Sequence, residues 1–338
     1  MSGLKLITLK EGADAADVAG SLKALGQWVS LAQGTQQPVL VVEPHSSACT
    51  RELLMDVPGV ADVLAPKSSH PKLDMLKGQA AIVGDLLIGG DSNPVVMAGP
   101  CSAESEEQIH ELAAIAARAG AHILRGGAYK PRTSPYSFRG RGDPALKWLS
   151  EAAHQNGLKL VTEVMSEHDV CVVAEHTDMI QIGSRNMQNF SLLKDVGAMA
   201  KPILLKRGMA ATLEDWMMSA EHLLAFGARS VVFCERGVQG LATQTRNMLD
   251  IGAVALLRHV HGLPVIVDPS HGTGRRDLIV PMARAGLAAG ADGVMVEIHM
   301  NPKEALSDGP QAVGEAELNA ICASARLFER FSRVSVRT

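Results

Sequence analysis

The pattern of apolar and polar positions changes near Pro94 and divides the chain into two parts. In the first part, segments that alternate with a period of two, as half-buried strands do, mix with segments that have the spacing of amphipathic helices. Their order is strand, helix, strand, strand, helix and strand, at Leu4–Leu9, Asp14–Leu25, Trp28–Ala32, Val39–Val42, Cys49–Met55 and Ala61–Leu64. This order predicts a small ferredoxin-like βαββαβ domain over residues 1–66.

A polar connection that contains Pro and Lys, Ala65–Gly78, follows this domain. Two short apolar runs then flank Gly84 and Asp85 within Ala80–Ile88. A turn pair between two apolar runs is typical of a β-hairpin. We therefore assign residues 67–93 to a linker and a hairpin that closes one end of the next domain.

From Pro94 onwards, short apolar runs alternate with helical stretches. The runs are Val95–Ala98, His122–Leu124, Lys159–Thr162, Met179–Ile182, Ile203–Leu205, Ser230–Phe233, Val265–Val267 and Gly293–Val296. Eight strands that are each followed by a helix match the count of a closed (β/α)8 barrel. The predicted fold class is therefore α/β, with a TIM barrel over residues 94–338 preceded by the small ferredoxin-like domain.

A reactive or charged residue follows every predicted strand within four positions. These residues are Cys101, Arg125, Glu163, Arg185, Lys206, Arg236, His271 and Glu297. In a barrel of this kind the C-terminal strand ends open on one face, where active sites lie. We expect the eight side chains to converge there, although strands of α/β proteins often end near a polar residue for no functional reason.

Composition narrows the class of protein further. The net charge of −4 argues against a general nucleic-acid surface. Five cysteines, an odd number with no C-x-x-C pair, favour a reducing compartment over a disulfide framework. The N-terminus lacks a signal-like apolar stretch, and no uncharged apolar run approaches the ~20 residues of a membrane span. We expect a soluble cytoplasmic protein.

Cys101, His271 and Glu297, with Asp308 beyond the last strand, offer a thiolate, an imidazole and two carboxylates. This donor set suits one divalent first-row ion, Mn²⁺, Fe²⁺, Zn²⁺ or Co²⁺, better than Mg²⁺ or a closed structural zinc site. Spacing alone leaves an alternative, because a strand-end cysteine is often a small buried hydrophobe and a lone histidine a core residue. The meeting of the four on one barrel face favours the metal site.

Cationic side chains form a second group, and half of them lie in a loop stiffened by Pro131 and Pro135. They are Arg125, Lys130, Arg132, Arg185, Lys206 and Arg236, with Thr133 as a hydroxyl donor in the same loop. Two phosphates of about −1.5 to −2 charge each and one carboxylate would balance most of this charge. The group predicts two small phosphorylated substrates or one bisphosphate. The glycine-rich Ser270–Arg276 lacks the spacing of a Walker or dinucleotide motif.

Seven segments of the barrel together resemble the 3-deoxy-D-arabino-heptulosonate 7-phosphate (DAHP) synthases. They are Met97-Ala-Gly-Pro-Cys-Ser102, Leu124-Arg-Gly-Gly-Ala-Tyr-Lys-Pro-Arg-Thr-Ser-Pro135, Gln181-Ile-Gly-Ser-Arg-Asn186, Leu205-Lys-Arg-Gly208, Cys234-Glu-Arg-Gly237, Val267-Asp-Pro-Ser-His271 and Val296-Glu-Ile-His299. The likeness covers about Pro94 to Asp308, and the Lys-Pro-Arg-Thr-Ser run is its most specific part. The N-terminal module is similar in pattern to that of the type Iβ branch.

The resemblance implies the first step of the shikimate pathway to aromatic amino acids. In this metal-dependent aldol-type condensation, phosphoenolpyruvate and erythrose 4-phosphate give DAHP and phosphate. Cys101, His271, Glu297 and Asp308 match the family's metal ligands. Arg125, Lys130, Arg185, Lys206 and Arg236 match the groups around phosphoenolpyruvate, and Arg132 with Thr133 the phosphate site of erythrose 4-phosphate.

The chemistry gives catalytic roles to Lys130, His271 and Glu163. Negative charge grows on the aldehyde oxygen, so a metal ion with His271 among its ligands, helped by proton donation from Lys130, would stabilise it. Water must then add at C2 of the enol phosphate. Either the metal ion or Glu163 holds that water, and the sequence leaves both open.

Other functions remain as alternatives. The related 3-deoxy-D-manno-octulosonate 8-phosphate synthases carry an Asn-containing loop where this chain has Lys130-Pro-Arg-Thr133. A barrel that only senses phosphometabolites is expected to have lost a metal ligand or Lys130, and none is missing. The resemblance further implies a homotetramer, and an aromatic amino-acid effector that acts through residues 1–66, for which assembly is the alternative role.

Overall fold

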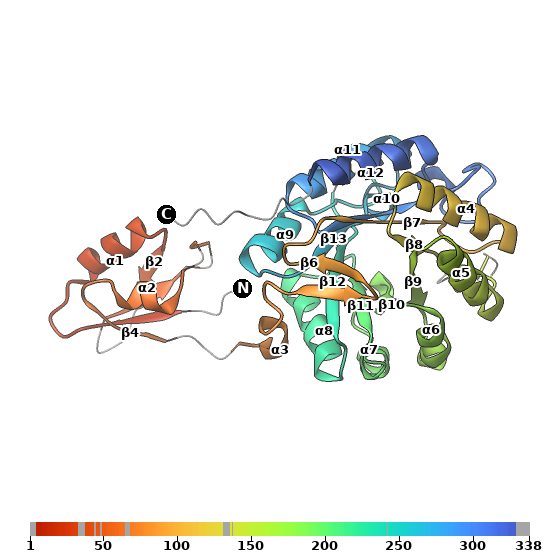
Figure 1. Cartoon of the computed structure of the whole chain (residues 1–338). Coiled ribbons are helices and arrows are strands. Elements are labelled where there is room, and N and C mark those ends of the chain that lie inside the picture. Colours follow the sequence, from red (N-terminus) through yellow and green to blue (C-terminus); the bar gives the residue numbers. More distant parts are fainter. Residues whose placement is uncertain are drawn as a thin grey trace. The chain divides into compact units, whose positions relative to one another are not determined.

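The computed structural model describes residues 5–32, 38–43, 45–47, 49–64, 68–130, 136, 138–241 and 243–328. The chain divides into two compact units, Met1–Pro71 and Lys72–Thr338, whose elements are labelled in Figure 1. The division falls at the start of a short helix, α3 (Pro71–Asp74). In the described part of the chain, no helix has the length and apolar character needed to cross a membrane.

The first unit is a four-stranded antiparallel sheet with two helices. Its elements are β1 (Leu6–Leu9), α1 (Ala15–Ala24), β2 (Val29–Leu31), β3 (Val39–Val42), α2 (Arg51–Met55) and β4 (Val60–Leu64). The strand order β2-β3-β1-β4 confirms the ferredoxin-like prediction. Buried side chains such as Ile7, Leu22 and Leu54 form the core of this unit.

Capping side chains determine where the two helices of this unit begin. Asp14 caps α1, and Thr50 Oγ1 accepts a hydrogen bond from the backbone N–H of Leu53 at 3.3 Å. Such a cap satisfies a donor that has no partner within the first helical turn. The second helix therefore begins at Arg51 and not at Cys49, where the apolar spacing placed its start.

Eight parallel strands of the second unit close into a barrel in the order β10-β11-β12-β13-β14-β7-β8-β9. They are β7 (Val95–Gly99), β8 (Ile123–Arg125), β9 (Lys159–Val164), β10 (Met179–Ile182), β11 (Pro202–Lys206), β12 (Ser230–Glu235), β13 (Val265–Val267) and β14 (Gly293–Glu297). Each overlaps one of the eight apolar runs, and the predicted TIM-barrel fold class is confirmed.

Helices cover the outside of the barrel strands (Figure 1). They are α4 (Glu106–Ala119), α5 (Asp143–Gln155), α6 (Val170–His176), α7 (Phe190–Ala198), α8 (Leu213–Ala225), α9 (Ile251–Ala255), α11 (Arg276–Ala288) and α12 (Glu315–Leu327). Shorter turns are η1 (Glu167–Asp169), η2 (Ser184–Asn186), the π-helical η3 (Leu256–Val260) and η4 (Gly309–Gln311). Buried apolar side chains fill the layer between strands and helices, where the ring of Trp216 packs edge-on to that of Phe233 at 5.0 Å.

A hairpin of β5 (Ala80–Val83) and β6 (Leu86–Gly89) lies at the N-terminal ends of the barrel strands. Its turn comes so close to the start of β9 that a Cβ on Gly84 would lie 2.7 Å from Lys159 Cε. The buried hairpin residues Ala81, Val83 and Ile88 join the side chains that fill the barrel interior, among them Met97, Leu204 and Cys234. The hairpin and this interior layer close the end of the barrel opposite the predicted site.

Four barrel strands extend beyond the predicted apolar runs and end at a polar residue, among them β12, which ends at Glu235 and pairs there with β13. Arg125 ends β8, Lys206 ends β11 and Glu297 ends β14, and each is paired with a neighbouring strand. A residue inside a hydrogen-bonded ladder has a fixed backbone, so these side chains start from rigid positions. The glycine-rich segment, in contrast, folds into the short helix α10 (Pro269–Thr273).

Candidate active site

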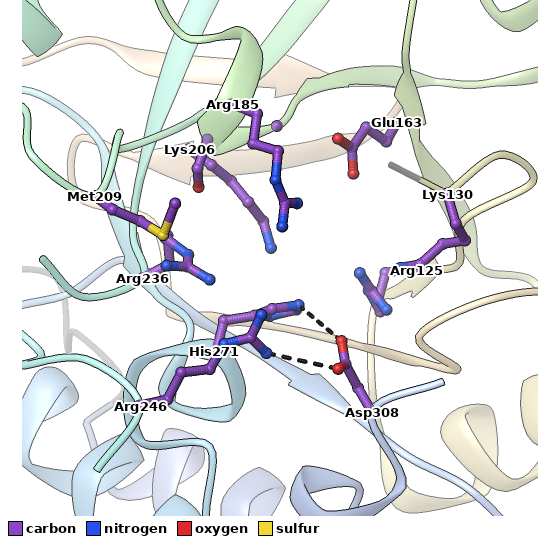
Figure 2. Close-up of a pocket in the computed structure, with 12 residues that line it drawn as sticks. Arg125, Lys130, Glu163, Arg185, Lys206, Met209, Arg236, Arg246, His271 and Asp308 are labelled. Atoms are coloured by element: carbon purple, nitrogen blue, oxygen red, sulfur yellow. Dashed lines mark ion pairs between the residues drawn. The ribbon is translucent and has the colours of Figure 1, made fainter. Parts of the chain in front are cut away.

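A cavity opens at the C-terminal ends of the barrel strands, and most of its lining side chains are charged (Figure 2). The lining residues are Arg125, Lys130, Glu163, Gly183, Ser184, Arg185, Lys206, Met209, Arg236, Arg246, His271 and Asp308. Six of the eight residues predicted to ring this face are among them. The other two, Cys101 and Glu297, are buried and contact the lining residues Asp308 and Arg125 respectively.

The four predicted metal ligands lie together in this site. Donor atoms of Cys101, Glu297 and Asp308 all lie within 4.8 Å of one another, and the Cys101 thiol donates to Asp308 Oδ2 at 3.2 Å. His271 Nε2 lies 3.3 Å from Glu297 Oε1 and 4.0 Å from Asp308 Oδ2. The four residues follow three different strands, so the barrel and not sequence spacing assembles the group.

Asp268 orients the His271 ring. His271 Nδ1 donates to Asp268 Oδ2 at 2.7 Å, and Lys206 Nζ donates to the same oxygen at 2.6 Å. Burial alone would raise the pKa of Asp268, but His271 and Lys206 hold it well below its usual range. An ionised acceptor places the ring proton on Nδ1, an assignment made from the hydrogen-bond network. The lone pair of Nε2 then faces Glu297 and Asp308.

This arrangement fits a divalent cation held by the four groups. A lone pair that faces a carboxylate oxygen at 3.3 Å is repulsive unless a proton or a cation lies between them. Burial lowers the pKa of His271, which disfavours the proton. Burial also raises the pKa of the Cys101 thiol to about 12, so only a bound metal ion would hold that sulfur as a thiolate at neutral pH. The sulfur, nitrogen and carboxylate donors suit a first-row divalent ion.

Two buried guanidinium groups have an atom without a hydrogen-bond partner among the described residues: Arg125 Nε and Arg236 Nη1. Arg125 is otherwise well held, since its Nη1 donates to Pro100 O at 2.6 Å and to Glu297 Oε1 at 3.2 Å. Burial lowers the pKa of Arg236. A buried donor left unpaired costs about 1–3 kcal/mol, so an anion that accepts from Arg236 in this cavity would be bound favourably.

The remaining cations surround the same cavity. Arg185, on η2, and Lys206 project toward the cavity from one side, and Arg125 and Lys130 from the other (Figure 2). Arg185 is exposed, whereas the other three are buried or half-buried. Cations on opposite sides of one cavity can hold the charged groups of a ligand placed between them.

Lys130 is connected directly to the predicted metal site. Its Nζ donates to the backbone oxygen of Cys101 at 3.0 Å and to the sulfur of the same residue at 2.9 Å. Burial alone would lower the pKa of Lys130, but Cys101 and Glu297 raise it above the ordinary value. Lys130 is therefore charged at neutral pH and has a proton to donate.

Glu163, near the end of β9, extends toward the cavity beside Gly183. Gln181 Nε2 donates to Glu163 Oε2 at 3.0 Å. A Cβ on Gly183 would lie 1.9 Å from Glu163 Oε1, so only glycine at that position leaves room for the carboxylate. The neighbouring strand thus determines both the orientation of Glu163 and the space that it occupies.

Two residues that the sequence placed in the site lie outside the described part of the chain, and several residues of the observed site were not predicted. Arg132 and Thr133, assigned to the second phosphate, lie outside the described residues. Asp268 was missed although it follows β13 directly, closer to the strand end than His271, which was a usable signal. Arg246 and Gln311 were missed because they lie in loops and a short turn, where no periodic pattern marks them.

Comparisons with known proteins show what the whole chain is similar to. A family model described as the DAHP synthetase I family matches residues 67–327. A phospho-2-dehydro-3-deoxyheptonate aldolase of Thermotoga maritima is 41% identical over 319 residues, which cover 91% of this chain and 93% of the relative. A 2-dehydro-3-deoxyphosphooctonate aldolase of Acidithiobacillus ferrooxidans is 34% identical over 236 residues, 64% of this chain and 83% of the relative.

Solved structures show the same relationship. The crystal structure of a DAHP synthase from Thermotoga maritima matches with a TM-score of 0.74 and 37% identity, over 96% of this chain and 97% of that chain. A truncated form of 3-deoxy-D-arabino-heptulosonate 7-phosphate synthase from the same organism matches with a TM-score of 0.68 and 42% identity, over 74% of this chain and 91% of that chain. The heptonate aldolases thus include a relative that is similar over nearly the whole chain.

Proposed function

Because the chain belongs to the DAHP synthetase I family, we propose that it condenses phosphoenolpyruvate with erythrose 4-phosphate to give DAHP and phosphate. The family match and the 41% identical relative confirm the resemblance to DAHP synthases. The chain is therefore an enzyme of the 3-deoxy-7-phosphoheptulonate synthase type, which performs an aldol-type condensation of the shikimate pathway. The two substrates and the metal ion are our proposal.

The charge pattern of the cavity is the observation that carries this proposal. Arg125, Lys130, Arg185, Lys206 and Arg236 gather beside one thiol, one imidazole and two carboxylates. The cations match a substrate that has both a phosphate and a carboxylate, as phosphoenolpyruvate has. The thiol, imidazole and carboxylates match a metal ion next to the aldehyde of the second substrate.

In the proposed reaction, Arg185, Lys206 and Arg236 bind the phosphate of phosphoenolpyruvate and so orient the face of the enol. The unpaired Nη1 of Arg236 gains an acceptor when this phosphate binds. Positioning of this kind turns an encounter of two substrates into a reaction of aligned groups.

Carbon–carbon bond formation needs a proton donor. C3 of phosphoenolpyruvate attacks the aldehyde carbon, and the aldehyde oxygen takes a proton from the Lys130 ammonium, which the raised pKa keeps available. Cys101, His271, Glu297 and Asp308 would hold the divalent ion, which when bound supplies a Lewis acid for that oxygen. Asp268 keeps the His271 ring in its orientation throughout.

The second half of the reaction adds water at C2 and releases phosphate. Glu163, oriented by Gln181, is the carboxylate that takes a proton from this water in our proposal. The oxygen of the water bonds to C2 and the bond from C2 to the phosphate oxygen breaks, while the proton held by Glu163 passes to the departing phosphate. The remaining proton of the water returns to Lys130 as C2 becomes the keto carbon of DAHP. Inorganic phosphate leaves from the cations that had bound it.

An assay of phosphoenolpyruvate consumption with two aldose phosphates tests the proposed function. We expect consumption with erythrose 4-phosphate and not with arabinose 5-phosphate, loss of activity after chelation, and recovery with Mn²⁺. A preference for arabinose 5-phosphate would assign the chain to the octonate aldolases. Binding of both phosphates without consumption of either would indicate a sensor.

Truncation of Arg132 is expected to raise the KM for erythrose 4-phosphate by about 10–150-fold, because one charge-assisted contact to phosphate is worth roughly 1.5–3 kcal/mol. The KM for phosphoenolpyruvate should change much less in the Arg132→Met enzyme. Arg185→Met is the matched variant and should show the opposite pattern. Initial rates with each substrate varied in turn measure both, and equal effects on the two substrates would contradict the assignment.

We also propose that residues 1–66 form a regulatory module for an aromatic amino acid, tyrosine or phenylalanine. Every residue placed in the reaction follows Pro94, so the first unit has no part in the chemistry. The truncated relative matches 74% of this chain, which supports a barrel that folds without the module. Coupling between an effector and the active site is typically worth 1–3 kcal/mol, or about 5–150-fold in affinity.

Deletion of residues 1–66 is expected to leave an active enzyme that tyrosine and phenylalanine no longer inhibit. The cut retains α3, whose Leu73 packs in the barrel core. Initial rates with and without each amino acid, for the deleted and the full-length enzyme, measure the effect. A full-length enzyme indifferent to tyrosine, phenylalanine and tryptophan at millimolar concentrations would favour an assembly role for the module.

A homotetramer is the assembly that we propose from the family resemblance. Ile82 and Leu87 on the hairpin are 63% and 49% exposed. Apolar side chains next to each other on a surface are often buried by a partner. Sedimentation equilibrium of the purified chain checks this assembly, and a monomer at micromolar concentration would exclude it.

A further inference from the structure

We propose that Gln311 and Arg246 form a bridge that holds the Glu297 and Asp308 carboxylates in the orientation required for metal binding. The inference rests on the metal site of the proposed function and adds two positioning residues to it. Neither residue supplies a metal ligand in this proposal.

The Gln311 side chain occupies the centre of the bridge. Its Nε2 donates to Glu297 Oε2 at 2.6 Å, and its Oε1 accepts from Arg246 Nη1 at 3.1 Å. Gln311 is only 3% exposed, so water does not readily replace these bonds. Because Arg125 Nη1 holds the other oxygen of Glu297 at 3.2 Å, hydrogen bonds fix both oxygens of this carboxylate.

Arg246 extends the bridge to the second carboxylate. Its Nη1 lies 3.6 Å from Asp308 Oδ1, the ion pair drawn in Figure 2. Asp308 has φ 52°, a left-handed conformation that is uncommon for a residue other than glycine. The residue also belongs to the same turn as Gln311, whose backbone N–H donates to Asp308 O at 3.1 Å. The turn and the guanidinium therefore restrain this backbone and its side chain together.

The loop that carries Arg246 is anchored to the element that carries His271. The backbone N–H of Arg246 donates to Thr273 O at 2.8 Å, and Asn247 Nδ2 donates to His271 O at 3.0 Å. The bridge thus connects this loop and α10 with the turn η4. Replacement of a residue that hydrogen-bonds to a metal ligand commonly lowers metal affinity or activity by about 10–100-fold.

The chemistry of the bridge requires an amide at position 311. An amide donates to Glu297 with its nitrogen and accepts from Arg246 with its oxygen. Methionine has a similar size but does neither well. A glutamate would keep the contact with Arg246 but would place a second carboxylate against that of Glu297.

Mn²⁺ binding to the metal-free full-length protein, measured by calorimetry without substrates, tests the bridge. We expect Gln311→Met to weaken Mn²⁺ binding by about 10–100-fold and Gln311→Glu to weaken it at least as much. Arg276→Met is the matched control: it removes an exposed ion pair with Glu317, 2.7 Å long, and should leave the affinity unchanged. In the Co²⁺ protein, the visible absorption bands should shift in Gln311→Met and not in the control, because the geometry around the ion changes.

Arg246→Met supplies an independent variant, because its side chain is 38% exposed and its loss does not threaten folding. We expect about a 10-fold loss of Mn²⁺ affinity, and the double variant with Gln311→Met should lose less than the product of the two single losses, because both act through one bridge. Parent-like Mn²⁺ affinity in Arg246→Met and Gln311→Met would overturn the inference, as would a parent protein that binds no divalent ion. Normal Mn²⁺ binding without DAHP formation would overturn the proposed function alone.

Discussion

Replacement of Lys130 with methionine is expected to lower kcat by about 10²–10⁴-fold, the range that a positioned proton donor contributes. Methionine keeps most of the length of the side chain but cannot protonate the aldehyde oxygen. It also loses the hydrogen bond that Lys130 Nζ makes to the Cys101 sulfur at 2.9 Å. Phosphoenolpyruvate consumption at saturating substrate and Mn²⁺ measures kcat.

Two further variants serve as controls for the Lys130→Met measurement. Lys147→Met removes an exposed lysine from α5 on the outside of the barrel and should leave kcat unchanged. Lys130→Arg keeps the positive charge but gives up its proton far less readily, so it should recover substrate binding and little of the rate. A kcat for Lys130→Met within about 10-fold of the parent would assign the proton to another donor.

Cys101→Ser is expected to reduce activity by more than about 100-fold, beyond the range for residues that only surround metal ligands. A hydroxyl does not ionise at neutral pH and is a poor ligand for a first-row ion, so added Mn²⁺ should not restore the activity. The fold should survive, because serine replaces sulfur with a smaller acceptor that Lys130 still reaches. Metal content after dialysis and the rate with excess Mn²⁺ measure the two effects.

Cys171→Ser is the matched control for Cys101→Ser. Cys171 is exposed on α6, so this variant should keep both metal and activity. Full activity of the parent enzyme in a chelated, metal-free preparation would refute the metal site. An active Cys101→Ser enzyme with normal metal content would instead show that three ligands are enough.

The fold was predictable from the sequence because buried strands and helices show a regular pattern of apolar residues. Strands buried on both faces of a barrel read as short apolar runs, and runs such as Met179–Ile182 and Val265–Val267 match the observed strands without change. Helix ends were less predictable. The start of α2 depends on the hydrogen bond of Thr50 Oγ1 and not on apolar spacing.

The candidate site was predictable where a side chain follows directly from a strand end. This rule located Arg125, Lys206 and Glu297, since the barrel brings strand ends together whatever the distance in sequence. The rule cannot separate adjacent cations. Arg207, next to Lys206, lies outside the cavity lining and pairs with Glu235 at 3.0 Å and Asp250 at 2.9 Å. Successive side chains along a strand point to opposite faces, so only one of these two cations can face the cavity. Which of them does so is known only from the three-dimensional structure.

Contacts between loops could not be predicted from the sequence. Asp268 acts on His271 from three residues away, which a helical turn explains once α10 is known. Arg246 and Gln311, in contrast, are far apart in the chain, and they meet because the loop after β12 and the turn after β14 both lie at the C-terminal ends of the barrel strands. Such a pair leaves no periodic or local signal in a single sequence.

The hairpin at the opposite end of the barrel also affects the route by which small molecules reach the cavity. Its apolar side chains Ala81, Val83 and Ile88 pack with the barrel interior and make that end a floor. In the proposed reaction, substrates and product phosphate would therefore both pass through the opposite end, where Arg185 and Arg236 line the cavity. The cations that we propose to bind phosphoenolpyruvate are then the same ones from which the product phosphate would have to dissociate. Their affinity for phosphate groups would have to be high enough to bind the substrate and low enough to release the product. Free phosphate is then expected to compete with the substrate for the same cations.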